Sequence, residues 1–195
     1  MNAVIVPTTY RAILSGLWMV WVAYWAVTAL RAKTVARRES AASQASHVIP
    51  LMIVAWLLIK PPLHSQAFAL QLLPPMLARY QVGLALVLGG LLFSVWARIH
   101  LAGNWSASVT VKERHELVRS GPYRLVRHPI YTGLLTGFLG TAVFRGDAQG
   151  FIAVAIALAA LWHKLRVEER FMEETFGDAY RDYRAKVKAL IPFVL

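Results

Sequence analysis

The sequence predicts an all-α integral membrane protein with about five transmembrane helices and a cytoplasmic helical segment at its C-terminus. Its 195 residues are 57% hydrophobic and only 16% charged, a balance that ordinary soluble domains do not have. The apolar residues form runs that approach or reach the length needed to cross a bilayer. Seventeen of the 21 lysines and arginines fall in alternate connections between these runs, and the positive-inside rule assigns such connections to the cytoplasm.

Five apolar runs are the candidate spans: Ala12–Leu30, Ser46–Ile59, Val82–Ala97, Ile130–Phe144 and Phe151–His163. The first is longer than a signal-peptide core and has no clear small-residue cleavage site, so we expect it to be retained. The second is short and contains Pro50, which indicates a tilt, an extension through its polar flank or a re-entrant course. Leu63–Leu77 is interrupted by Pro74 and Pro75, which favours an interfacial loop over a sixth span.

We expect one domain over residues 1–195, with three spans in 1–97 and a cofactor-binding half in 98–195. With an odd number of spans, the charge bias places the N-terminus outside and the C-terminus in the cytoplasm. Because the formal charge of +11 is concentrated in particular loops, it does not indicate a nucleic-acid partner. The absence of cysteine excludes disulfides, thiolate zinc sites and cysteine nucleophiles. The six histidines have no metal-ligand spacing, so we expect no metal.

The fourth and fifth spans are predicted to form a hairpin, because only the few residues around Arg145–Gly150 join them. Beyond the fifth span the helix is expected to continue through Lys164–Phe176 and to stop at Gly177. Asp178 is expected to cap a second, amphipathic helix that lies on the membrane or covers the site. Small residues allow close helix packing, and the third and fourth spans contain several: Gly83, Gly89, Gly90, Gly133, Gly137 and Gly140.

Polar residues gather in two segments that the topology places on one side of the membrane. The first, His115–Gly133, reads HELVRSGPYRLVRHPIYTG, and the second, Lys164–Arg170, contains Glu168 and Glu169. Charges at a bilayer edge are costly unless they reach water or bind something, so these segments form a candidate ligand site. The alternatives are interfacial anchoring for the first segment and solvated ion pairs for the two glutamates.

Several pieces of the second half occur in the order and spacing of one protein family: HELV…GPYRLVRHPIYTG, Glu168–Glu169, Phe176–Gly177, Tyr180 with Tyr183, and Ile191–Pro192. Together they resemble the isoprenylcysteine carboxyl methyltransferase family, which is grouped with phospholipid methyltransferases. The preceding stretch GNWSASVTVKERH is similar to bacterial members. The resemblance covers about the last hundred residues. It implies a site for S-adenosylmethionine at the cytoplasmic membrane face, here in a bacterial inner membrane.

The resemblance also implies which residues line the cofactor: His115, Glu116, Leu117, Val118, Tyr123, His128, Pro129, Ile130, Tyr131 and Glu168. Glu168 would face the positive charge of the methyl donor. Lys164, one turn earlier, stands where relatives place a basic residue that contacts the substrate, and we expect Lys164 and Arg127 to bind the substrate. Prenylcysteine enzymes usually have arginine at the Lys164 position, and lysine lacks the two-pronged contact with a carboxylate.

The predicted function is S-adenosylmethionine-dependent methyl transfer to a lipid-like or prenylcysteine-type carboxylate, with Glu168 and Lys164 as catalytic candidates. An ionised carboxylate needs no strong base, so alignment and water exclusion would dominate catalysis. A phospholipid amine is the first alternative acceptor, and Glu168 or Glu169 would then be the base. An NADPH-dependent sterol-type reductase is disfavoured by the short chain. A non-enzymatic scaffold is disfavoured by the intact set His128, Tyr131 and Glu168.

Overall fold

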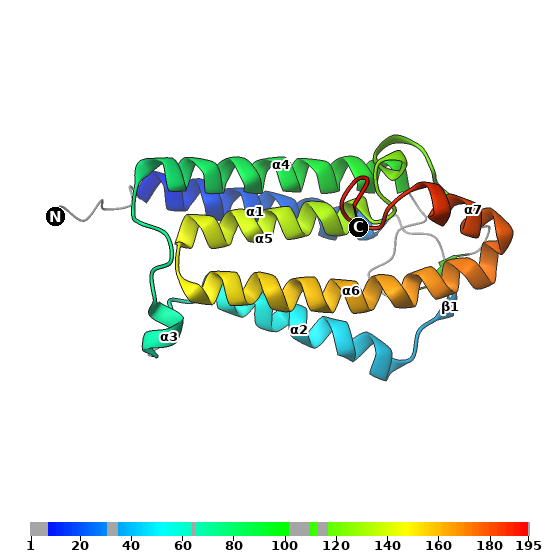
Figure 1. Ribbon diagram of the computed structural model, residues 1–195, viewed down its shortest axis with the longest axis horizontal. Helices are drawn as coiled ribbons and strands as arrows, with labels where there is room; N and C mark the ends of the chain where they lie inside the picture. The colour runs from blue at the N-terminus through cyan, green and yellow to red at the C-terminus, as the bar shows by residue number, and fades with distance from the viewer. Residues whose placement is uncertain (1–7, 31–34, 64, 102–109, 113–116, 195) are drawn as a thin grey trace.

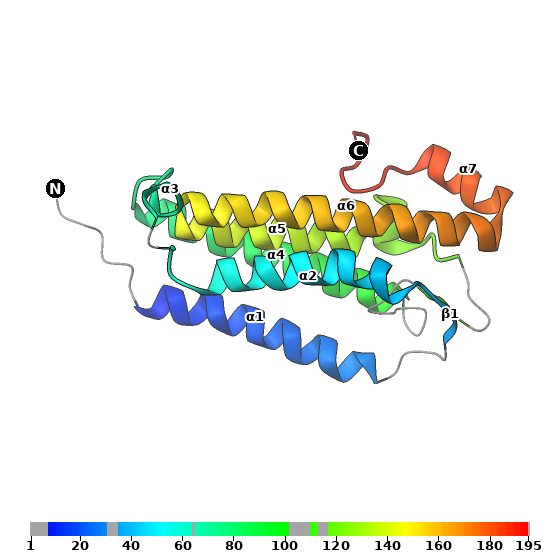
Figure 2. The same ribbon diagram turned by 90° about the horizontal axis from the view of Figure 1, so that it is seen from below.

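Five long helices run side by side in the computed structural model, which describes residues 8–30, 35–63, 65–101, 110–112 and 117–194 (Figures 1 and 2). The long helices are α1 (Thr8–Ala29), α2 (Ala41–Ile59), α4 (Leu77–Leu101), α5 (Pro129–Arg145) and α6 (Ala148–Phe176). The shorter elements are β1 (Val35–Arg38), α3 (Gln66–Ala69), β2 (Thr110–Lys112), the 3-10 helix η2 (Gly121–Arg124) and α7 (Asp178–Lys186). Successive long helices run in opposite directions (Figure 1). Apart from the short strands β1 and β2, the described elements are helices, which confirms the predicted all-α class.

The predicted spans coincide with the long helices. By length and composition, α1, α2, α4 and α6 can each cross a membrane. Helix α5 has 17 residues, which is at the lower end of the range for a span, and it lies among the other four (Figure 1). The structure adds one element that the sequence did not indicate, an antiparallel pairing of β1 with β2.

Several predicted boundaries need correction. Helix α2 begins at Ala41 and has 19 residues, because the Ser40 hydroxyl accepts a hydrogen bond from the Ser43 amide and caps the helix. The second span is therefore a continuous helix through Pro50, long enough to cross a bilayer. Gly177, at φ 52°, ends α6 and also precedes α7. Asp178 is thus the first residue of α7, and the prediction that it caps this helix was wrong.

Glycines bring α4 and α5 into backbone contact, as the sequence predicted. A Cβ on Gly90 would lie 2.5 Å from the Gly133 carbonyl oxygen, and one on Gly133 would lie 2.4 Å from the Gly90 oxygen. Further along, a Cβ on Gly83 would meet the Gly140 oxygen at 2.8 Å. These approaches leave no room for a side chain. Helix α5, which begins at the candidate site, is thereby held at a fixed position against α4.

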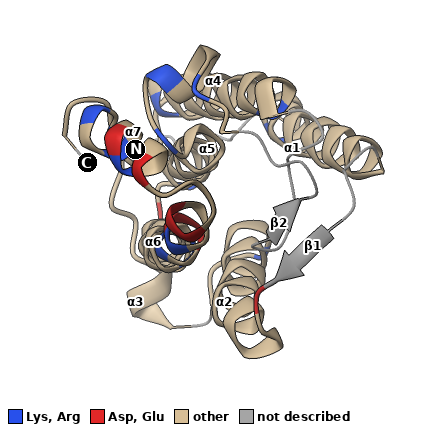
Figure 3. Cartoon of the chain, turned by 90° about the vertical axis from the view of Figure 1, so that its right-hand side faces the viewer, with Lys and Arg blue, Asp and Glu red and all other residues tan. Residues whose placement is uncertain are grey.

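One end of the bundle collects the segments that the sequence singled out. The C-terminal ends of α1 and α4 lie at this end together with β1 and α7 (Figures 1 and 2). Figure 3 looks onto it and shows basic and acidic segments together on α6 and α7. The opposite end carries the short α5–α6 turn, where Arg145 pairs with Asp147 at 2.8 Å. The polar end therefore holds the candidate site.

Candidate active site

The start of α5 supplies the first part of the site. Pro129 occupies the first helical turn, where its missing N–H costs nothing and its fixed φ favours helix. The preceding residue, His128, accepts hydrogen bonds from the amides of Tyr131 and Thr132 through its carbonyl oxygen. Its imidazole stacks on the Tyr131 ring, with centroids 5.4 Å apart and planes 4° apart. The helix start thus fixes two side chains of the predicted set beside each other.

Helix α6 supplies the second part. Lys164 and Glu168 lie one turn apart, so both side chains leave the same face of the helix. The Tyr131 hydroxyl donates to Glu168 Oε1 at 2.5 Å, and His128 Nδ1 lies 3.5 Å from Glu168 Oε2. Lys164 Nζ lies 5.5 Å from the centre of the Tyr131 ring, a cation–π distance. The structure therefore brings together the two segments that the hairpin was predicted to join.

Glu169, the residue after Glu168 on α6, is the centre of a buried cluster of charged side chains. Arg127 donates to Glu169 Oε1 through Nε at 2.8 Å and also contacts it through Nη2 at 2.6 Å. Arg184 Nε is 3.6 Å from the other carboxylate oxygen. The Arg127 and Glu169 side chains are 9% and 7% exposed. Arg127 is therefore held in an ion pair with Glu169, and its predicted contact with substrate stays a prediction.

His128 joins the two glutamates. Its Nε2 lies 3.2 Å from Glu169 Oε1, opposite the Nδ1 contact with Glu168. Burial alone would lower the pKa of His128, but the hydrogen bonds with Glu168 and then Glu169 outweigh burial and raise this pKa above its ordinary value. The imidazolium form is therefore favoured between the two carboxylates.

The chain after α7 returns to the start of α5 and covers it. The amides of Arg127 and His128 donate to the carbonyl oxygens of Lys188 and Ala189 at 2.8 and 3.0 Å. The Thr132 hydroxyl donates to the Leu190 carbonyl at 2.7 Å. These backbone contacts have no signature in the side-chain pattern, so the sequence did not indicate them. The predicted C-terminal helix therefore covers the site together with the segment that follows it.

The Tyr183 side chain fastens α7 to η2. Its hydroxyl donates to the Tyr123 carbonyl at 2.6 Å, and burial raises the pKa of Tyr183 to about 12. The phenol is thus a stable donor at neutral pH. Tyr123 is itself buried, in one apolar cluster with Ile130 and Tyr131, against which Val118 packs.

Leu117 and Val118 are half-buried beside η2. The remaining predicted cofactor residues of this stretch, His115 and Glu116, lie outside the described residues.

Sequence reasoning missed a buried pair formed by α2 and the segment before it. His47 of α2 is 0% exposed, and its Nε2 lies 3.4 Å from Glu39 Oε1. The Ser43 hydroxyl donates to the other Glu39 oxygen at 2.6 Å. A histidine inside an apolar span is costly to bury, and this cost was the signal available in the sequence.

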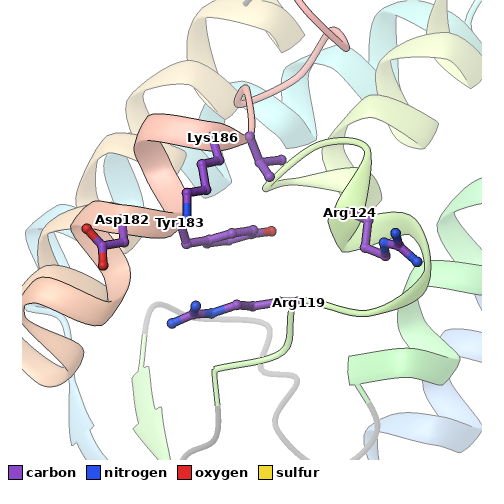
Figure 4. A pocket seen from close by; sticks show the side chains of 6 residues that line it. Arg119, Arg124, Asp182, Tyr183 and Lys186 are labelled. Carbon is purple, nitrogen blue, oxygen red and sulfur yellow. The ribbon is translucent and has the colours of Figure 1, made fainter.

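A hollow of about 410 Å³ lies at the polar end of the bundle, between η2 and α7 (Figure 4). Its lining includes three cationic side chains and one carboxylate: Arg119, Arg124, Lys186 and Asp182. The Arg119 guanidinium lies 5.8 Å from the Tyr183 ring centre and donates to the Ala179 carbonyl at 2.7 Å. Arg119 and Arg124 belong to the predicted segment but were not among the predicted site residues.

Comparison with known proteins identifies relatives of this arrangement. Residues 78–179 match the family model described as phospholipid methyltransferase. A probable protein-S-isoprenylcysteine O-methyltransferase from Oryza sativa is 33% identical over 112 residues, which are 57% of this chain and 53% of the relative. Methanethiol S-methyltransferase 1 from Bradyrhizobium diazoefficiens is 35% identical over 71 residues, covering 36% of this chain and 24% of the relative. This chain thus spans about half the length, or less, of these curated relatives.

A solved structure shares the fold. The eukaryotic intramembrane Ras methyltransferase isoprenylcysteine carboxyl methyltransferase matches with a TM-score of 0.52 and 21% identity. The match covers 98% of this chain and 55% of the other. The likeness therefore includes the N-terminal helices α1 and α2, which lie outside the residues matched by the family model.

Proposed function

The chain belongs to the phospholipid methyltransferase family, and we propose that it transfers a methyl group from S-adenosylmethionine to a lipid-like acceptor. The proposal depends on one observation above all, the hydrogen bond from Tyr131 to Glu168. This bond joins the RHP-x-Y-x-G segment to the paired glutamates, the two pieces of sequence that the family resemblance singles out. The reaction would take place at the polar end of the bundle, within a chain whose apolar helices make it an integral membrane protein.

The described residues have the chemistry that S-adenosylmethionine requires. This cofactor, when bound, supplies a methyl group on a positively charged sulfur. The Glu168 carboxylate is held by Tyr131 and carries the negative charge that suits a sulfonium or an ammonium. The Tyr131 ring presents a π face, which also attracts cations. We assign cofactor binding to these two residues together with His128, Pro129 and the backbone of the segment before η2.

Lys164 is the candidate for binding the acceptor. It is buried, with its ammonium over the Tyr131 ring, so it presents a positive charge beside Glu168. An anionic group of the acceptor, a carboxylate or a phosphate, would pair with it. For a prenylcysteine-type carboxylate, the chain's contribution would be alignment and the exclusion of water. The covering segment at Lys188–Leu190 is suited to exclude water from the start of α5.

The site is proposed to face the cytoplasm. In the sequence, 17 of the 21 basic residues follow the first, third and fifth predicted spans, and an excess of Lys and Arg beside spans marks the cytoplasmic side. We extend this proposal to a bacterial inner membrane with the N-terminus outside. Labelling of single cysteines introduced at Arg11 and Lys186, from either side of sealed vesicles, tests the orientation. Reaction of both cysteines from the same side would contradict it.

Methyl transfer itself is tested with the full chain in lipid nanodiscs. Radiolabelled S-adenosylmethionine is supplied with extracted membrane lipids and with a small prenylated cysteine, and the methylated product is identified. We expect Glu168→Gln to reduce transfer by a factor on the order of 10², because electrostatic stabilisation by one preorganised group has that size. Glu174→Gln is the matched control, since Glu174 lies exposed on the same helix. Undiminished transfer by Glu168→Gln would remove Glu168 from the mechanism.

A further inference from the structure

His47 lies on the face of α2 that packs against α6. Val54, two turns further along α2, lies in one buried cluster with Ala153 and Ala157 of α6. Residues seven apart lie on nearly the same face of a helix, so His47 continues this contact toward the polar end. Because α2 and α6 run in opposite directions (Figure 1), the corresponding step on α6 leads from Ala157 to Lys164. The two helices thereby direct His47 toward Lys164.

The charged groups around His47 agree with this alignment of His47 on α2 with Lys164 on α6. Lys164, Glu168 and His163 of α6 and Glu39 of the segment before α2 have the largest electrostatic effects on His47 among the described residues. Lys164 and Glu168 are also the residues that meet Tyr131. The pair of His47 and Glu39 therefore borders the proposed site from the N-terminal half of the chain.

The His47 ring is buried without the hydrogen bonds that a structural role would provide. Within the described part of the chain, neither ring nitrogen has a hydrogen-bond partner. Leaving a buried polar group unsatisfied costs about 1–3 kcal/mol. Nε2 lies 3.4 Å from Glu39 Oε1, so a small adjustment gives an Nε2–H bond to the carboxylate. This tautomer leaves the lone pair on Nδ1 available to a ligand.

The two glutamates on α6 are less suited to take a proton from a substrate. Glu169 is held by Arg127 and Arg184, and Glu168 receives the Tyr131 hydroxyl hydrogen bond. Both carboxylates also contact His128. Removing either one from these partners would leave buried positive charge uncompensated. A neutral imidazole backed by a carboxylate is the common arrangement of a general base.

We propose that His47 accepts the proton of the methyl acceptor, with Glu39 as the residue that positions the imidazole. This inference rests on the proposed methyl transfer and narrows its substrate class. The acceptor is a nucleophile that carries a proton, an amine or a thiol, and its anionic portion pairs with Lys164. A carboxylate acceptor is already ionised at neutral pH and has no use for such a base.

In the proposed step, the acceptor N–H or S–H bond breaks, and its proton goes to Nδ1 of His47. The electron pair left on nitrogen or sulfur forms the bond to the methyl carbon, while the pair of the breaking methyl–sulfonium bond stays on the donor sulfur. Glu39 stabilises the imidazolium through its Nε2–H. Release of the proton to water restores the neutral ring.

The test compares His47→Asn and His47→Gln with Ser46→Asn, in the full chain in nanodiscs. Ser46 is the exposed residue directly before His47 on α2, so it controls for introducing an amide side chain into this helix. The acceptors are phosphatidylethanolamine, a small thiol that carries a carboxylate, and a small N-acetylated prenylcysteine. We expect methylation of the amine or the thiol, and a kcat reduced by about 10²-fold or more in both His47 variants. Binding of S-adenosylmethionine should be unchanged in both variants, which also verifies their folding.

Two further readouts separate a base from a structural residue. The kcat of the unsubstituted protein should rise with pH through a single ionisation that both His47 variants lack. Glu39→Gln should lower kcat while leaving KM for the acceptor unchanged. Without any methyl donor, the unsubstituted protein should bind lysophosphatidylethanolamine about 10-fold more tightly than lysophosphatidylcholine, which has no N–H to donate. His47→Asn should abolish this preference.

The outcomes distinguish the two proposals. A kcat within threefold of the unsubstituted protein in both His47 variants, or methylation of the carboxylate alone, would overturn the role of His47 and leave methyl transfer standing. Loss of S-adenosylmethionine binding in the His47 variants alone would give the ring a structural role and overturn the proposal. Failure of the unsubstituted protein to bind S-adenosylmethionine would overturn the proposed function, and the inference with it.

Discussion

Replacing Glu169 by glutamine should destabilise the protein strongly. The Glu169 carboxylate receives Arg127 at 2.8 Å and lies 3.2 Å from His128 Nε2, and all three side chains are at most 10% exposed. Glutamine keeps the shape but removes the charge, which leaves a buried guanidinium uncompensated. Breaking a buried ion pair in this way costs about 3–5 kcal/mol. The glutamine oxygen still accepts a hydrogen bond, so we expect the lower end of that range, about 3 kcal/mol.

Thermal unfolding in detergent measures this effect. For a chain of this size, about 3 kcal/mol corresponds to a fall in Tm of roughly 6–12 °C. Glu174→Gln, an exposed change five residues along the same helix, should shift Tm by less than about 2 °C. Arg127 also donates to the carbonyl oxygens of Arg184 and Val187, so Glu169→Gln should accelerate tryptic cleavage after Lys188. Equal Tm values for the two glutamine variants would refute the buried-charge argument.

Three further predictions concern the same end of the bundle and its packing. Since the pKa of His128 is raised in the folded protein, its stabilising charge is fully present below about pH 6.5 and is lost as pH rises through the raised value. The Tm advantage over His128→Asn should therefore shrink between pH 6 and 9, and a constant advantage would contradict this. Gly90→Ala should lower the free energy of unfolding by about 1–3 kcal/mol, because its Cβ would meet backbone atoms of α5. Gly89→Ala is the control, since a Cβ there would have no atom within 4 Å, and its Tm should be unchanged or raised. Equal Tm values for the two variants would count against the α4–α5 contact. Tyr131→Phe removes the hydrogen bond to Glu168 and should weaken S-adenosylmethionine binding about 10-fold by calorimetry, while unaltered affinity would place Tyr131 outside the cofactor site.

The spans were predictable because crossing a bilayer requires a long apolar run. The ends of the helices were less predictable, because the residues of the capped first turns are small or polar and lie outside these runs. The second run starts at Ser46 in the sequence pattern, yet α2 continues back to Ala41. Ala41–Gln44 are small or polar residues that hydropathy alone does not assign to a helix. The helix includes them because the Ser40 hydroxyl caps its first turn. The same reasoning explains why α6 begins at Ala148, after the cap of Asp147.

The meeting of the α5 and α6 segments at the candidate site was predictable because both belong to one short hairpin and carry dense local motifs. Its other parts depend on contacts between distant segments. His47 is a single histidine in an apolar run, and only the packing of α2 on α6 brings it toward Lys164. The covering segment acts through the backbone carbonyls of Lys188 and Ala189, whose positions no side-chain pattern records. A sequence motif locates residues that share a segment, whereas such cross-chain contacts require the fold.

The packing of α2 on α6 also explains at which level along the bundle the proposed methyl transfer would take place. From Ala153 through Ala157 to Ala160, the α6 surface is buried and carries small side chains, so the two helices approach closely. At the next turn the same face carries Lys164, and one turn later Glu168. The change from alanine to ionisable residues places the first polar groups where α2 presents His47. A donor and an acceptor would meet at this level, because the alanine face below it leaves no space and the covering segment after α7 closes the polar end above it.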